Sequence, residues 1–245
     1  DVSPKLQQLA QYAVSLGVNF NIIENYPVTH LKSSGFFVWR EEQNYLVMDA
    51  GQVGPTYIPG HAHADTLSLE CSINGERVIV NSGISEYQIG DVRTFQRSTA
   101  AHSTLVINNE NSSEVWGAFR VAQRAQIIES YVDHTKSGFF VGGAHDGYTK
   151  LKGSFIHKRT LNYSRNEIIV NDNVSPSDFS KIDIYFHLGP NIRVVEIDQL
   201  TFLLTSLNNV TEATIEFYTG TVKLEDSWWY PTFGKKTKNL TLINS

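Results

Sequence analysis

The chain has 245 residues, 41% of them hydrophobic and 11% aromatic, which is enough for one large all-β domain or two small ones. A formal net charge of −5 without a basic run argues against nucleic acid as a partner, although it leaves an acidic polysaccharide open. A single cysteine excludes an internal disulfide framework, and no stretch has the length of a transmembrane helix.

The first segment predicts a helix. Apolar residues recur at helical spacing across residues 4–16, with Ser3 as an N-cap, Pro4 in the first turn and Gly17 as the stop. We expect residues 1–30 to form a helical linker or the remnant of a preceding domain, and residues 31–245 to form a β-sandwich.

From Asn19 onward the pattern predicts strands. A hairpin is expected over residues 36–49, and Asn74-Gly75 predicts a tight type I′ turn between two further strands. Residues 51–60 and 83–101 are expected to be loops, the second long enough to be functional. Short strands then recur at regular intervals, which predicts an antiparallel sandwich. They are expected at residues 105–108, 122–132, 139–144, 152–163, 167–173, 182–188, 193–197, 201–205, 214–218 and 220–224.

The stretch from Gly60 to Leu69 carries the chemistry. We expect it to be a strand in which His61, His63 and Asp65 share one face, because strand side chains alternate. His102 stands just before another apolar strand, and imidazole is the commonest protein ligand of zinc. By spacing alone, a pair of histidines hydrogen-bonded within a sheet is as good an interpretation as a metal site.

The motifs together are more specific than any one of them. They run in order over residues 45–195 and resemble the heparinase II/III-like polysaccharide lyases, which include heparin, heparan sulfate and alginate lyases. The matching motifs are His61-Ala-His63-Ala-Asp65, Asn81-Ser-Gly83, Tyr87, Arg97-Ser-Thr-Ala-Ala-His102, Glu114-x-Trp116-x-x-Phe119-Arg120, His145-Asp146-Gly147-Tyr148, His157-x-Arg159 and Phe186-His187-Leu188-x-Pro190.

The resemblance implies the C-terminal β-region of an enzyme that cleaves uronic-acid polysaccharides by β-elimination. It implies that an α-helical toroid precedes this region and supplies a tyrosine acid/base, so that this chain alone is expected to be inactive. A bacterial periplasmic or extracellular location goes with the family. The resemblance gives catalytic roles to His61, Tyr87 and Arg97, and Arg93 is expected to bind the substrate.

The resemblance also implies a structural zinc site at His63, Asn81 and His102. Zinc-binding members have an aspartate where this chain has Asn81, so the site loses a charge, and either zinc binds weakly or hydrogen bonds hold the site without it. Asn81→Asp is then expected to raise the zinc affinity. Asp65 is a candidate to orient an imidazole, or simply a strand cap.

Two other functions remain open. The first is a non-catalytic carbohydrate-binding or structural β-sandwich that kept the lyase fold and lost its chemistry. The second is a lyase-like protein that works in the assembly of surface polysaccharides. A toroid with tyrosine and histidine encoded upstream of Asp1 favours the lyase over both.

Overall fold

Alternating burial along the first strands builds the largest sheet. Phe37 and Trp39 are buried beside their cross-strand partners Met48 and Leu46, so one face of this hairpin joins the core. The computed structural model describes residues 6–18, 28–135 and 138–245. Within them the sheet runs in the order β1 (Val28–Leu31), β2 (Phe36–Glu41), β3 (Asn44–Asp49), β4 (Leu69–Ile73), β5 (Glu76–Val80), β13 (Ile182–Leu188), β18 (Thr237–Asn244) and β17 (Val222–Trp229), with β6 (Leu105–Ile107) also paired to β13.

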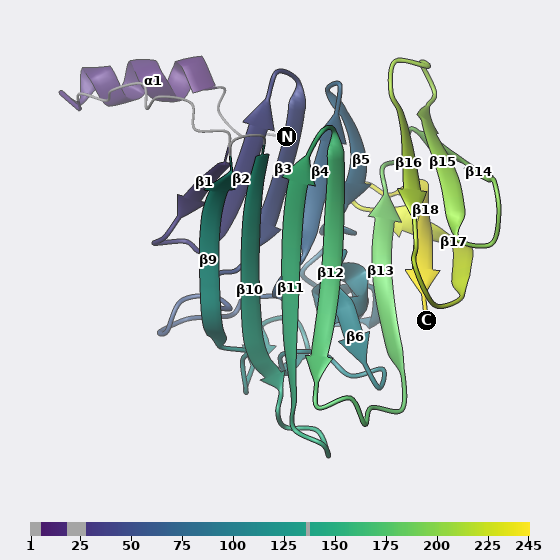
Figure 1. Ribbon diagram of the computed structural model, residues 1–245. Helices are drawn as coiled ribbons and strands as arrows, with labels where there is room; N and C mark the ends of the chain where they lie inside the picture. The colour runs from purple at the N-terminus through teal and green to yellow at the C-terminus, as the bar shows by residue number, and fades with distance from the viewer. Residues whose placement is uncertain (1–5, 19–27, 136–137) are drawn as a thin grey trace.

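A second sheet lies across the first, as Figure 1 shows. Phe139 and Val141 of its strand β10 are fully buried in the core that the two sheets share. The sheet has the order β12 (Glu167–Ser175), β11 (Phe155–Ser164), β10 (Gly138–Tyr148) and β9 (Ile127–Thr135). Every pairing of named strands in the described residues is antiparallel, so the expected antiparallel sandwich is confirmed.

Two smaller pieces complete the β-structure. One follows β13 and lies at the edge of the molecule, on the right in Figure 1. It has the order β14 (Ile192–Glu196), β15 (Thr201–Ser206) and β16 (Glu212–Glu216), and the other piece is a short ribbon of β7 (Val115–Trp116) and β8 (Arg120–Val121).

The main core fills the space between the two large sheets. Trp39 from β2 packs against Tyr163 of β11 at a ring-centroid distance of 4.5 Å and against Phe139 of β10 at 6.0 Å. Full burial of each such side chain contributes about 1.5–3 kcal/mol relative to exposure. The core therefore holds the two sheets face to face.

Helix α1 (Leu6–Ser15) falls where the sequence predicts it. Gly17 ends it in the left-handed region at φ 73°, while the expected cap at Ser3 and Pro4 lies outside the described residues. Leu9 on α1 and Leu16 just after it are 49% and 61% exposed, so this part of the expected apolar stripe lies at the surface. Strand β1 begins at Val28, so the sheet starts within the expected 1–30 segment.

The expectation of a plain loop over residues 83–101 is wrong in part. Helix α2 (Asp91–Arg97) and a 3₁₀ turn (Thr99–Ala101) lie within it. Neither α1 nor α2, the helices of the described residues, is long and apolar enough to cross a membrane.

Candidate functional site

The histidine-rich stretch is a loop and not a strand. Residues 61–68 form turns and bends before β4 begins at Leu69, so the expected alternation of His61, His63 and Asp65 on a strand face is wrong. The loop is fixed at Ala64, whose N–H donates to Arg97 O, and at Leu67, whose N–H donates to Asp49 O at 2.7 Å. Its path exposes His61 and leaves His63 only 9% exposed.

Arg97 holds this loop from α2. Its side chain is 1% exposed, and all five of its N–H donors bond to backbone carbonyls, at Ala62 twice and at Trp116, Gly117 and Arg120. The guanidinium thus ties the histidine loop to the β7–β8 ribbon. Such a side chain has no donor left for a substrate, so the expected catalytic role of Arg97 is not carried into the function proposed below.

Arg93 lies beneath the surface on the same helix. The side chain is 0% exposed, its Nε donates to Ala118 O at 3.1 Å, and its Nη1 lies 3.5 Å from His63 Nε2. Its Nη2 is buried without a hydrogen-bond partner among the described residues. The substrate-binding role expected of Arg93 therefore needs the rings above it to move.

His63 and His102 are brought together as predicted. His63 Nδ1 lies 3.2 Å from His102 Nε2, and His102 Nδ1 lies 2.8 Å from the carbonyl oxygen of Ser98. Burial, followed by the charges of His102, Arg93 and Arg97, lowers the pKa of His63 to about 2. Burial likewise lowers the pKa of His102 to about 4, so both rings are neutral at physiological pH.

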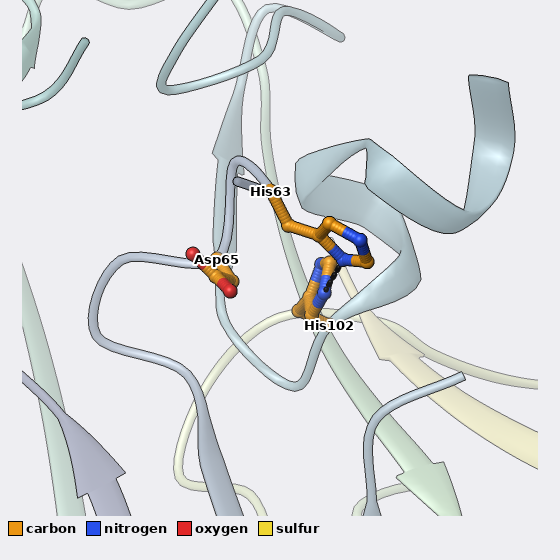
Figure 2. Close-up of side chains that lie close together, drawn as sticks. All are labelled: His63, Asp65 and His102. Atoms are coloured by element: carbon orange, nitrogen blue, oxygen red, sulfur yellow. Dashed lines mark hydrogen bonds between the residues drawn. The ribbon is translucent and has the colours of Figure 1, made fainter. Parts of the chain in front are cut away.

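Asp65 is the carboxylate beside this pair. Figure 2 shows the two rings in contact with Asp65 next to them, and one ligand atom from each of the three residues lies within 4.8 Å of the others. Burial raises the pKa of Asp65 to about 6, and burial together with Asp65 raises that of the neighbouring Asp49 to about 7. Two imidazoles and a carboxylate are ligand types that suit zinc.

Asn81, the third expected ligand, is engaged elsewhere. Its Oδ1 accepts a hydrogen bond from Ser103 N at 2.8 Å, and its Nδ2 donates to Glu70 Oε1 at 3.2 Å. Asn81 thereby fixes the chain next to His102. Asp65 is therefore the third side chain that groups with the two histidines, where sequence reasoning expected Asn81.

His61 and Tyr87 meet above Arg93. Their ring centroids are 5.1 Å apart, and Phe119 lies 5.3 Å from each of them. The Arg93 guanidinium lies 5.0 Å from the centroid of Tyr87. Sequence reasoning missed Phe233, which packs on Tyr87 at 4.6 Å; its only signal is its place just after the aromatic tail 227–231.

A crossing of two distant segments places Phe233. Tyr230 N donates to Ser82 O at 2.7 Å, and Tyr230 O accepts from Ile84 N at 3.2 Å. Gly234 N donates to Ser85 O at 2.9 Å. The segment between β17 and β18 is therefore docked on the loop that carries Tyr87.

A buried polar network supports the site from the second sheet. His145 Nε2 lies 3.1 Å from His157 Nδ1, and His157 Nε2 lies 2.7 Å from Asp172, which also binds Arg159 through both carboxylate oxygens. Arg159 then donates to Leu67 O and Ser103 O. Arg159 thereby clamps the two segments that carry His63 and His102.

The described residues thus form a two-sheet antiparallel sandwich whose loops bring His61 and Tyr87 together at the surface. The family described as "Heparinase II/III-like, C-terminal" matches residues 24–244, and the chain belongs to that family.

Known relatives agree with this assignment. A heparin-sulfate lyase of Bacteroides stercoris is 21% identical over 221 residues, which make up 85% of this chain and 30% of that protein. The solved structure of the heparan sulfate lyase HepC from Pedobacter heparinus superposes with a TM-score of 0.76 at 17% identity, over 97% of this chain and 38% of the other. A heparinase III structure gives 0.73 at 16% identity, over 97% and 40%. The chain thus spans about a third of the length of these relatives.

Proposed function

We propose that this chain is the β-region of a lyase that cleaves a uronic-acid-containing polysaccharide by β-elimination. The observation that carries the proposal is the exposed contact of His61 with Tyr87, two groups able to exchange protons at one surface. Membership of the heparinase II/III-like family supports the same reaction class.

The reaction sets the chemical needs. A base removes the proton at C5 of the uronate, an acid protonates the leaving oxygen at C4, and the negative charge that develops at the carboxylate must be neutralised. His61 is assigned to contact the uronate, to neutralise that charge or to remove the proton. Tyr87 is assigned to the second proton transfer beside it.

Arg93 contributes as a buried cation. Its guanidinium lies under Tyr87 and 5.8 Å from the centroid of Phe119. A fixed positive charge at that depth favours the approach of an acidic sugar without a direct contact. Arg97 holds the loop that presents His61, and the His63–His102 pair joins this loop to the segment after α2.

The remaining groups are assigned to the toroid that the family resemblance implies. Because the chain spans only 30–40% of its relatives, the cleft is proposed to form between this surface and that domain. The partner of the whole protein is proposed to be an acidic polysaccharide.

The test measures the ultraviolet absorbance of the unsaturated uronate product on a panel of acidic polysaccharides. We expect little or no turnover by this chain alone and turnover by the full-length protein. In the full-length protein His61→Ala and Tyr87→Phe should each lower kcat by roughly 10²–10⁴-fold, while Tyr57→Phe, at an 81% exposed tyrosine, should not.

Robust turnover by the chain alone would show that the β-region holds a complete site and that our division of roles is wrong. Full-length protein that binds the polysaccharides without turning over any of them would support the carbohydrate-binding alternative.

A further inference from the structure

We propose that Arg93 locks the His63–His102 pair in a metal-free hydrogen-bonded state and thereby excludes zinc from it. The inference does not depend on lyase activity, because it concerns the direction of hydrogen bonds inside the site.

The direction is set at the Ser98 end. A backbone carbonyl can only accept, so His102 Nδ1, 2.8 Å from Ser98 O, carries the proton. A neutral His102 then has a bare Nε2, which must accept from His63 Nδ1 at 3.2 Å. With its proton on Nδ1, His63 has a bare Nε2.

The Arg93 end of this series of hydrogen bonds also requires a bare Nε2 on His63. Arg93 Nη1 lies 3.5 Å from His63 Nε2, and a guanidinium can only donate. One arrangement therefore satisfies every contact: Arg93 donates to His63, His63 to His102, and His102 to Ser98. The lone pair of each imidazole therefore accepts a hydrogen bond within this series.

Zinc needs the opposite tautomer of His63. To bind through His63 Nδ1 and His102 Nε2, His63 must move its proton to Nε2, where it would point at the Nη1 protons of Arg93. The 3.2 Å separation of the nitrogens does not itself oppose zinc, since two ligands at 2.0–2.1 Å in a tetrahedron are about 3.3 Å apart. What opposes zinc binding is the Arg93 Nη1 donor that faces His63 Nε2.

Arg93 cannot easily leave. It is fully buried, its Nε is bonded to Ala118 O, and the rings of Tyr87 and Phe119 cover it. Within the described residues neither Arg93 nor Arg97 has an ion-pair partner, so two cations lie near the ligand atoms against the one carboxylate, Asp65, that lies beside them. A dication is repelled by both arginines, and Asn81 adds no second negative charge to that of Asp65.

The experiment titrates zinc into the chain by calorimetry after purification without chelator. Arg93→Met keeps a long side chain under the rings and removes both the charge and the donor. We expect no stoichiometric zinc in the wild type and at least a tenfold tighter, one-to-one site in Arg93→Met. Arg193→Met, at an exposed arginine on β14, is the matched charge control and should behave as wild type.

A second substitution locates the ion. Arg93→Met combined with His63→Gln should lose the new site, which separates it from zinc bound at exposed histidines. One tightly bound zinc per wild-type chain at this pair, or an affinity unchanged by Arg93→Met, would overturn the proposal.

A direct reading of the wild type keeps the proposal testable even where Arg93→Met fails to fold. Long-range ¹H–¹⁵N spectra distinguish the two nitrogens of each imidazole. The proposal requires His63 protonated on Nδ1 and bare on Nε2. A proton on His63 Nε2 would refute it without any variant.

Discussion

The side-chain amide of Asn81 donates to the carboxylate of Glu70, with 3.2 Å between Nδ2 and Oε1. An aspartate at this position would set two carboxylates against each other, and they cannot both be ionised at that distance without a cost. Burial already raises the pKa of Glu70, with the nearby Arg77 acting against that rise. Asn81 is thus matched to Glu70 as well as to Ser103.

Asn81→Asp should therefore lower the stability of the fold, whatever its effect on the zinc affinity. We expect the free energy of unfolding at pH 7 to fall by about 1–3 kcal/mol, the range for a buried polar group left without its partner. Glu70→Gln in the same chain should recover most of the loss, because an amide can donate to the new carboxylate. Denaturant unfolding of the single and double variants measures both effects.

Asn108→Asp is the control. Asn108 Oδ1 accepts from Ser180 N and Lys181 N, and a carboxylate keeps both bonds, so stability should change by less than about 0.5 kcal/mol. If Asn81→Asp is as stable as this control, the contact with Glu70 is not the reason for an asparagine at this place.

Arg159 should be among the most sensitive positions of the protein. It is 0% exposed and binds Asp172 twice while donating to Leu67 O and Ser103 O, so Arg159→Met removes the cationic partner of a buried carboxylate and a donor from each of two carbonyls. We expect a loss of about 3–5 kcal/mol.

The neighbouring residue supplies the comparison. Lys158 forms an ion pair with Glu129 at 2.9 Å, but both side chains are exposed, at 37% and 47%. Lys158→Met should cost less than about 1 kcal/mol. Similar losses for Arg159→Met and Lys158→Met in chemical denaturation would contradict the clamp assigned to Arg159.

The buried histidines should make stability depend on pH. Burial lowers the pKa of His145 and His157 from their ordinary value of 6.5, and the charge of Asp172 acts against this lowering. Below that value the unfolded chain binds more protons at these rings, so their contribution is complete above pH 6.5 and is lost as the pH falls. Each of the two histidines lowers the free energy of unfolding by up to about 1.4 kcal/mol for every unit by which the pH falls below 6.5. Asp49 and Asp65, whose pKa values are raised, act in the opposite sense over the same range.

The expected signal is therefore a difference between two proteins. His145→Gln can still accept from Gly147 N and donate to His157, and it no longer titrates. Between pH 6.5 and 5.5 its unfolding free energy should fall less steeply than that of the wild type. Parallel pH profiles in urea unfolding would mean that His145 is not kept neutral by the fold.

The sandwich was predictable because its strands alternate. The Asn74-Gly75 turn has φ 51° and 80°, as a type I′ turn requires, and the pattern that predicts it is local. Helix α2 was not predictable because its polarity is inverted: Arg93, Gln96 and Arg97 are buried while Val92 and Phe95 are more than a third exposed. A periodic apolar signal cannot find a helix that buries its polar face.

The site was predictable only in part for a similar reason. His63 and His102 come together as expected, and His61 lies against Tyr87, the other side chain to which the resemblance gives a catalytic role. The turn at Asp65–Leu67, where Leu67 has φ 61°, is held by the distant Arg159, so local alternation predicted a strand there. Phe233 reaches Tyr87 through the docking of Tyr230 on Gly83, a contact between residues far apart in the sequence.

Gly83 tests that docking. It has φ 80°, and a Cβ added there would lie 2.2 Å from Tyr230 O, so alanine must push the 230–234 segment away. We expect Gly83→Ala to lower the free energy of unfolding by more than about 1–3 kcal/mol, the range for backbone strain alone. The NOE contacts between Tyr87 and Phe233 should be lost with it.

Gly117→Ala separates strain from contact. Gly117 also has a positive φ, of 55°, but a Cβ there meets nothing within 4 Å, so only the strain of about 1–2 kcal/mol should appear. In the full-length protein Gly83→Ala should lower the lyase rate because Tyr87 loses its support, while Gly117→Ala should retain it. Equal stability and equal rates for the two variants would show that the Tyr230 crossing does not position Tyr87.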